Sequence, residues 1–222
     1  MSEGMMHGKY TPPWGGMMAH WKFDDDVNDA LGVFNGIPNG TPTYAAGISN
    51  NAIVLNGTSQ DMQLSHANAL IMGTWTVSAW VKLDNNASGR TNGIIGSRFG
   101  GENTFDFKID TNNGRLHADI GDGTVWFTSA ADQAYAFTPG VWYMVTMAVG
   151  EGRWDYYVNG NIVGAGGTLA GVPVFTLPTR TIHIGNSFGT EYFSGSLDEM
   201  YLFARVLRAN EIAALYNAIL VP

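Results

Sequence analysis

The feature that most constrains this chain is a series of short runs in which apolar and polar residues alternate. They recur from Ala19 onward, among them WTVSAWVKL, FDFKI and RLHADI, and turn residues separate them. A period of two is the side-chain period of a β-strand, and Gly, Asn and Asp between runs suit hairpin turns. The pattern predicts many short antiparallel strands.

The composition agrees with an all-β fold in one domain. Among 222 residues there are 29 glycines, and only 14% of residues are charged, a balance that suits strands joined by tight turns. The first 18 residues are rich in Met, Gly and Pro and have no periodicity, so we expect an irregular arm at 1–18 and a sandwich domain at 19–222.

The run at 75–83 predicts which side chains form the core. Alternation places five residues on one face, and we expect this face to point inward. They are Trp75, Val77, Ala79, Val81 and Leu83.

The C-terminal segment has a different period. Ile212, Leu215, Tyr216 and Ile219 recur at helical spacing, which predicts one short amphipathic helix over 210–219 that closes the sandwich. The expected fold is a two-sheet antiparallel β-sandwich, or jelly roll, with an irregular N-terminal arm and one short C-terminal helix.

Charge and residue usage exclude several classes of partner. The net charge is −8 and no basic stripe is present, so we expect no nucleic acid partner. There is no cysteine, which excludes disulfides and thiolate metal sites. Neither a signal peptide nor a membrane-spanning apolar run is recognisable, so we expect no membrane insertion.

Seven segments, in order, carry a resemblance to the laminin-G-like jelly-roll domains of the concanavalin A-like lectin and glucanase superfamily, over roughly residues 19–219. They are HWKFD at 20–24, NAIVLNG at 51–57, TVSAWV at 76–81, PGVWY at 139–143, YVNG at 157–160, IGN at 184–186 and GSLDE at 195–199. Relatives have Ser or Thr as a helix cap where this chain has Arg208, so we expect Asn210 to cap the helix instead.

The resemblance implies a Ca²⁺ site at one edge. In similar domains the aspartates of the first and last segments approach each other and loop carbonyls complete the shell; here they are Asp24 and Asp198. Hard oxygen ligands are those that Ca²⁺ prefers. A second interpretation stays open, in which Asp24 caps a turn and Asp198 accepts backbone N–H groups at a strand bulge.

Aromatic side chains near loop ends are candidates for stacking on sugar rings, because their apolar faces match the C–H face of a pyranose. The candidates are Trp126, Trp154, Tyr192 and Phe193. Trp126 and Trp154 also fit burial within strands, whereas Tyr192 lies in a Gly/Ser-rich loop and is expected to be exposed.

We expect no catalysis. The E-x-D-x-x-E motif of related glucanases is absent. The pairs Glu102/Asp106 and Glu151/Asp155 are four residues apart, which on a strand means about 13 Å, too far for the paired acids of a glycosidase.

Two functions follow as hypotheses. The first is a lectin-like surface-attachment module that recognises glycans or other surface polymers, with calcium as a candidate cofactor. The second is a decoration, cement or fibre component of a large assembly such as a phage virion, docked on other subunits through Tyr10, Pro12, Pro13 and Trp14. Both favour an extracellular or virion surface.

Overall fold

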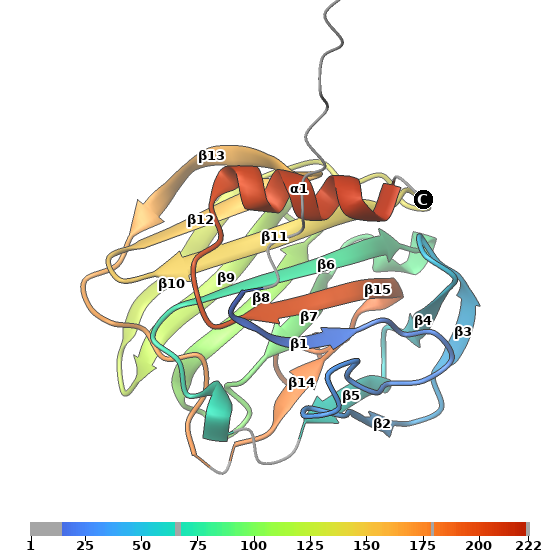
Figure 1. The fold of residues 1–222 in the computed structure, drawn as a ribbon, viewed down its shortest axis with the longest axis horizontal. Coiled ribbons are helices and arrows are strands. Elements are labelled where there is room, and N and C mark those ends of the chain that lie inside the picture. Colours follow the sequence, from blue (N-terminus) through green and yellow to red (C-terminus); the bar gives the residue numbers. More distant parts are fainter. Residues whose placement is uncertain (1–14, 65–67, 179, 221–222) are drawn as a thin grey trace, which may run out of the picture.

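The computed structural model describes residues 15–64, 68–178 and 180–220. They form two antiparallel sheets packed face to face, with one α-helix on the outside of the first sheet (Figure 1). The predicted class, a two-sheet β-sandwich of the jelly-roll type, is confirmed.

Sheet A has eight strands, and its central strand β6 carries the run that predicted the core. In spatial order the strands are β13 (Asn161–Thr168), β12 (Arg153–Val158), β11 (Tyr143–Gly150), β6 (Trp75–Leu83), β15 (Ser194–Phe203), β4 (Asn51–Asn56) and β3 (Thr43–Ala46). The eighth strand, β1 (Met17–Trp21), pairs with the end of β15. Met17 and Met18 therefore belong to the sheet rather than to the predicted arm, whose residues 1–14 lie outside the described range.

Sheet B has seven strands and packs behind sheet A in the view of Figure 1. In spatial order they are β10 (Trp126–Ala134), β9 (Arg115–Gly123), β8 (Asn103–Asp110), β7 (Thr91–Gly96), β14 (Ile182–Ile184), β5 (Asp61–Leu64) and β2 (Ile37–Asn39). Short 3₁₀ helices lie at η1 (Asn68–Leu70) and η2 (Asn85–Ala87).

The main core lies between the sheets, and β6 contributes to it as predicted. Trp75, Val77, Ala79, Val81 and Leu83 all lie in this core. The Trp75 ring contacts Phe105 of β8 edge-on, with ring centroids 5.0 Å apart. Burying large aromatic and branched side chains from both sheets is the main stabilising contribution in such a sandwich.

The helix α1 (Ala209–Leu220) confirms the predicted C-terminal helix and covers the outer face of sheet A. Ile212 and Leu215 are fully buried and lie in a second apolar cluster with Trp80 and Tyr157 of the sheet. For this reason β6 is buried on both faces, which its alternating sequence alone does not indicate.

The start of α1 corrects one expectation. The helix begins at Ala209, so Asn210 lies inside it and Arg208 holds the capping position. The Glu211 carboxylate accepts a hydrogen bond from the Arg208 backbone N–H at 2.8 Å and forms an ion pair with Arg205. The Glu211 side chain thus caps the N-terminus of the helix without a Ser or Thr side chain.

Candidate functional site

The outer face of sheet B carries charged residues where its strands alternate. The inward side chains of β8 and β9 are apolar, and the outward ones are Asp106, Lys108 and Asp110 on β8 and Arg115, His117 and Asp119 on β9. Asp106 lies opposite Asp119 and Lys108 lies opposite His117 in the antiparallel register. Charged groups from two strands therefore meet on one surface.

The centre of this surface is a buried ion-pair cluster. The Lys108 ammonium lies 2.9 Å from the Asp106 carboxylate and 3.2 Å from that of Asp119. The Arg98 guanidinium also contacts both carboxylates. Asp106 is fully buried. Two cations share two carboxylates, which fixes each side chain.

Burial and partners act on the protonation of the cluster in opposite directions. Burial raises the pKa of Asp106 to about 6, although Lys108 opposes this. Burial would also raise the pKa of Asp119, but the hydrogen bond from His117 and the charges of Lys108 and Arg98 hold it well below its usual value. The cluster therefore keeps Asp119 ionised at neutral pH.

His117 extends the cluster toward the edge strand β10. Its Nδ1 lies 2.5 Å from Asp132, and its Nε2 lies 3.4 Å from Asp119. Burial would lower the pKa of His117, but these two carboxylates raise it. Arg115 also pairs with Asp132. Hydrogen-bond donors and acceptors therefore extend as far as β10, the edge strand of sheet B.

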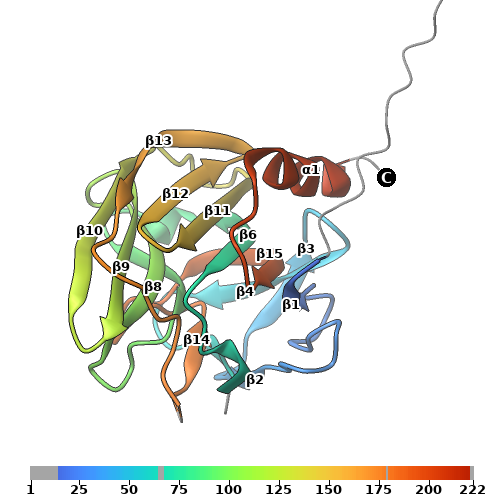
Figure 2. The same cartoon turned by 60° about the vertical axis from the view of Figure 1, so that its left-hand side comes forward.

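Two aromatic rings flank Arg98 at the other end of this surface. The guanidinium carbon lies 5.0 Å from the ring centroid of Trp126 and 4.4 Å from that of Phe188. Trp126 is half-buried and Phe188 is exposed. We call Arg98, Arg115, His117, Asp119, Trp126 and Asp132 the outer strip. Five of these residues belong to β9 and β10, which lie on the left in Figure 2, and Arg98 lies in the loop between β7 and β8.

Two glycines of β7 let the loop before β15 cover the neighbouring part of sheet B. A Cβ at Gly93 would lie 2.1 Å from the backbone nitrogen of Ser187, and one at Gly96 would lie 2.0 Å from its carbonyl oxygen. From this loop Glu191 reaches Lys108 at 3.1 Å. The loop bounds the outer strip on one side.

The structure brings the predicted calcium ligands to the same turn. Asp198 accepts hydrogen bonds from the backbone N–H groups of Ile48 and Ser49 at 2.7 and 3.1 Å, at the bulge of β15. Asp24 accepts one from the Asn51 N–H at 3.1 Å. Burial raises the pKa of Asp198 to about 7, against the lowering effect of these backbone donors. These contacts are those of the second interpretation.

No group of three or more His, Asp or Glu side chains within the described ranges is arranged to hold a metal ion. A Ca²⁺ shell at this turn would need carbonyl oxygens beside Asp24 and Asp198. The calcium site therefore stays a prediction.

The remaining predicted residues lie in different environments. Trp154 and Phe193 are buried in the main core, 7% and 0% exposed, so a bound sugar cannot stack on them in this conformation. Tyr192, which was expected to be exposed, is half-buried. The arm residues Tyr10, Pro12, Pro13 and Trp14 lie outside the described residues.

The carboxylates of the two pairs that were judged too far apart for catalysis have separate partners. Glu102 pairs with Arg180, and Asp155 pairs with Arg153. Asp106 instead shares Lys108 and Arg98 with Asp119 of the adjacent strand. The signal for this pairing was the alternation of FDFKI and RLHADI on either side of one turn, which places their polar positions on one face.

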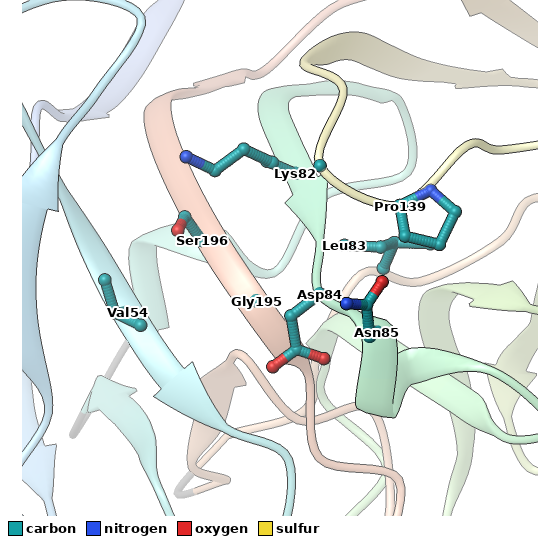
Figure 3. A pocket seen from close by; sticks show the side chains of 9 residues that line it. Val54, Lys82, Leu83, Asp84, Asn85, Pro139, Gly195 and Ser196 are labelled. Carbon is teal, nitrogen blue, oxygen red and sulfur yellow. The ribbon is translucent and has the colours of Figure 1, made fainter.

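A pocket lies on the outer face of sheet A, on the opposite side of the sandwich (Figure 3). Its volume is about 420 Å³, and its lining comes from β4, the end of β6, the start of β15 and the loop at Pro139. Several of its residues lie in segments that carry the family resemblance, but none of them was predicted as a site residue. Among the described residues, no helix is long and apolar enough to cross a membrane.

Comparison with known proteins agrees with this architecture. The family profile described as the concanavalin A-like lectin/glucanases superfamily, laminin-G type, matches residues 56–213. An alignment of 156 positions that covers 66% of this chain is 27% identical to adhesion G-protein coupled receptor V1 of Danio rerio, although the match spans only 2% of that receptor.

Two solved structures show the same fold. Domain 4 of AbnA, an extracellular arabinanase from Geobacillus stearothermophilus solved in complex with arabinotriose, superposes with a TM-score of 0.73 at 23% identity, covering 90% of this chain and 98% of that one. The botulinum neurotoxin serotype D binding domain superposes with a TM-score of 0.70 at 16% identity, covering 93% of this chain and 52% of that one. The profile match extends over well over half of the residues, and the chain belongs to the concanavalin A-like lectin/glucanase superfamily.

Proposed function

We propose that the chain is a non-catalytic, lectin-like module that binds a glycan or other surface polymer along the outer strip of sheet B. The observation that carries the proposal is the fixed geometry of the strip. Its guanidinium, imidazole and carboxylate groups are held by one another and by the buried Lys108, next to the half-buried ring of Trp126. Groups that are ordered before binding lose little entropy when a ligand arrives.

The chemistry of the strip suits hydroxyl groups. Carboxylates accept hydrogen bonds and guanidinium groups donate them, while an indole ring offers an apolar face to a sugar ring. Arg98 uses only Nη1 toward described side chains, so Nε and Nη2 are available to a ligand.

Burial argues against catalysis by the central carboxylate pair. Asp106, whose raised pKa would suit a general acid, is 0% exposed beneath Arg98. A general acid must come within hydrogen-bond reach of the oxygen that it protonates. The pair therefore serves to hold Arg98 and His117 in place.

Charge favours a neutral ligand. Within the strip the charges of Arg98 and Arg115 balance those of Asp119 and Asp132, and the whole chain carries a net charge of −8. Polyanions such as sulfated or uronic-acid glycans would be repelled over the range of a Debye length, about 10 Å at 0.1 M salt.

The similar structures support a binding role, since one was solved with arabinotriose and another is a toxin binding domain. A role at an extracellular surface fits the similarity to an adhesion receptor.

Retention on immobilised polysaccharides tests this function. Arabinan, cellulose, mixed-linkage β-glucan and galactan serve as neutral probes and heparin as the polyanion. We expect retention on at least one neutral polymer, no retention on heparin, and at least tenfold weaker binding for Trp126→Ala. Val125→Ala, an exposed neighbour, is the control and should bind as the unmodified chain does.

The same assay with a chelator tests the calcium prediction. Weaker binding in chelator, restored by added Ca²⁺, would support a site between Asp24 and Asp198. No retention on any neutral polymer in either condition would contradict glycan binding. The second hypothesis, docking within a large assembly, rests on arm residues outside the described range and stays a prediction.

A further inference from the structure

The pocket on the outer face of sheet A presents fixed polar atoms to solvent. Its floor is Gly195 and Ser196 of β15, flanked by Val54 of β4 and by Lys82 of β6 (Figure 3). At Gly195 φ is +138°, and a Cβ there would lie 2.1 Å from the Lys82 carbonyl oxygen. Only glycine fits this close approach, and the floor stays free of a side chain.

Asp84 supplies a rigid acceptor at one end of the pocket. Its Oδ1 accepts three hydrogen bonds, from the backbone N–H groups of Asn86 and Ala87 at 2.8 and 3.0 Å and from the Ser194 hydroxyl at 2.9 Å. Its Oδ2 accepts none from the described part of the chain. The carboxylate is therefore oriented by one oxygen, and the other is left for a ligand.

Lys82 supplies a fixed donor at the other end. Its ammonium lies 4.8 Å from the ring centroid of Trp142, a cation–π contact that restrains the side chain. It forms no ion pair with any carboxylate of the described residues. The side-chain amide of Asn85, beside Asp84 in Figure 3, adds a further donor and acceptor.

We infer that this pocket is a second sugar-binding site, independent of the outer strip, that accepts a single neutral sugar residue. Asp84 Oδ2 accepts hydrogen bonds from hydroxyl groups, Asn85 and Lys82 donate to ring or hydroxyl oxygens, and Val54 and Pro139 contact the apolar edge of the ring. The volume of about 420 Å³ lies in the range of small-molecule sites. Because the two sites lie on opposite sheets, one domain would hold two glycan chains.

Chemical-shift mapping of the whole chain with L-arabinose, D-glucose and D-galactose tests this site. We expect at least one of these sugars to shift the amide signals of Asp84, Asn85 and Gly195. Asp84→Asn keeps an oxygen for the turn but replaces the free acceptor with a donor, so we expect at least tenfold weaker binding at the pocket. Asp26→Asn, the same change at an exposed turn, should leave binding unchanged.

The design separates this site from the outer strip. Trp126→Ala should leave the pocket shifts intact, and pocket binding would persist even if no polysaccharide engages the strip. The inference is overturned if none of the three sugars shifts the pocket signals, or if Asp84→Asn binds the sugar as tightly as the unmodified chain.

Discussion

The two sheets of this sandwich have outer faces covered in opposite ways. Sheet A is covered by α1, which buries Ile212 and Leu215 against aromatic side chains. Sheet B is covered by ion pairs in which Lys108 and Arg98 bridge Asp106 and Asp119. An apolar cover stabilises by removing surface from water, and the part of sheet A beneath α1 exposes no groups for recognition. The pocket at Asp84 lies on a part of this sheet that α1 does not line. A charged cover requires desolvation of each group, but it places ordered donors and acceptors at the surface.

The largest expected effect comes from breaking the charged cover at its centre. Lys108→Met leaves Asp106 and Asp119 with one cation between them, and we expect the free energy of unfolding to fall by about 3–5 kcal/mol. Urea unfolding measures it. Lys22→Met, at an exposed lysine, should change it by less than about 0.5 kcal/mol.

A double variant separates an unpaired charge from a packing defect. In Asp106→Asn with Lys108→Met the buried carboxylate that lost its partner is neutral, so we expect part of the stability to return. A loss below about 1 kcal/mol for Lys108→Met alone would show that the cluster is not effectively buried.

The apolar cover should respond more moderately. Leu215→Ala removes a fully buried side chain from the cluster under α1, and we expect a loss of about 3 kcal/mol in urea unfolding. Polysaccharide retention by the outer strip should not change, because the helix lies on the other sheet. A parallel loss of retention would show that the two covers are coupled. Asn217→Ala, exposed on the same helix, is the control.

The sequence predicted the apolar parts of this comparison well, because their signal is local. The alternation of the run at 75–83 identified the inward residues, and helical spacing identified Ile212 and Leu215 as a buried face. The burial of Trp80 under the helix was not predicted, since it depends on contact between segments far apart in the chain.

The charged cover was harder to predict for the same reason. Asp106 and Lys108 were visible as outward residues of one strand, but their partners come from β9 and from Arg98 before β8. Register decides that Asp106 meets Asp119, and register depends on the geometry of the intervening turn. Trp126 was identified from its residue type, whereas its contact with Arg98 required the fold.

The smallest expected effect, about 1 kcal/mol, concerns acid pH and distinguishes the two covers directly. The pKa of Asp119 in the folded chain is lowered, because its hydrogen bond with His117 and the nearby cations outweigh burial. A carboxyl whose pKa is lowered in the folded chain contributes stability that is fully present above its unfolded pKa near 3.8. This stability is lost as the pH falls through the folded pKa.

Asp119→Asn lacks this titration. The difference in the free energy of unfolding between this variant and the unmodified chain should therefore narrow as the pH falls from 5 to about 2.5. The curve for Leu215→Ala should stay parallel to that of the unmodified chain, because this substitution removes no titrating group. If Asp119→Asn also stays parallel in urea unfolding across this series, the charged cover does not hold Asp119 ionised.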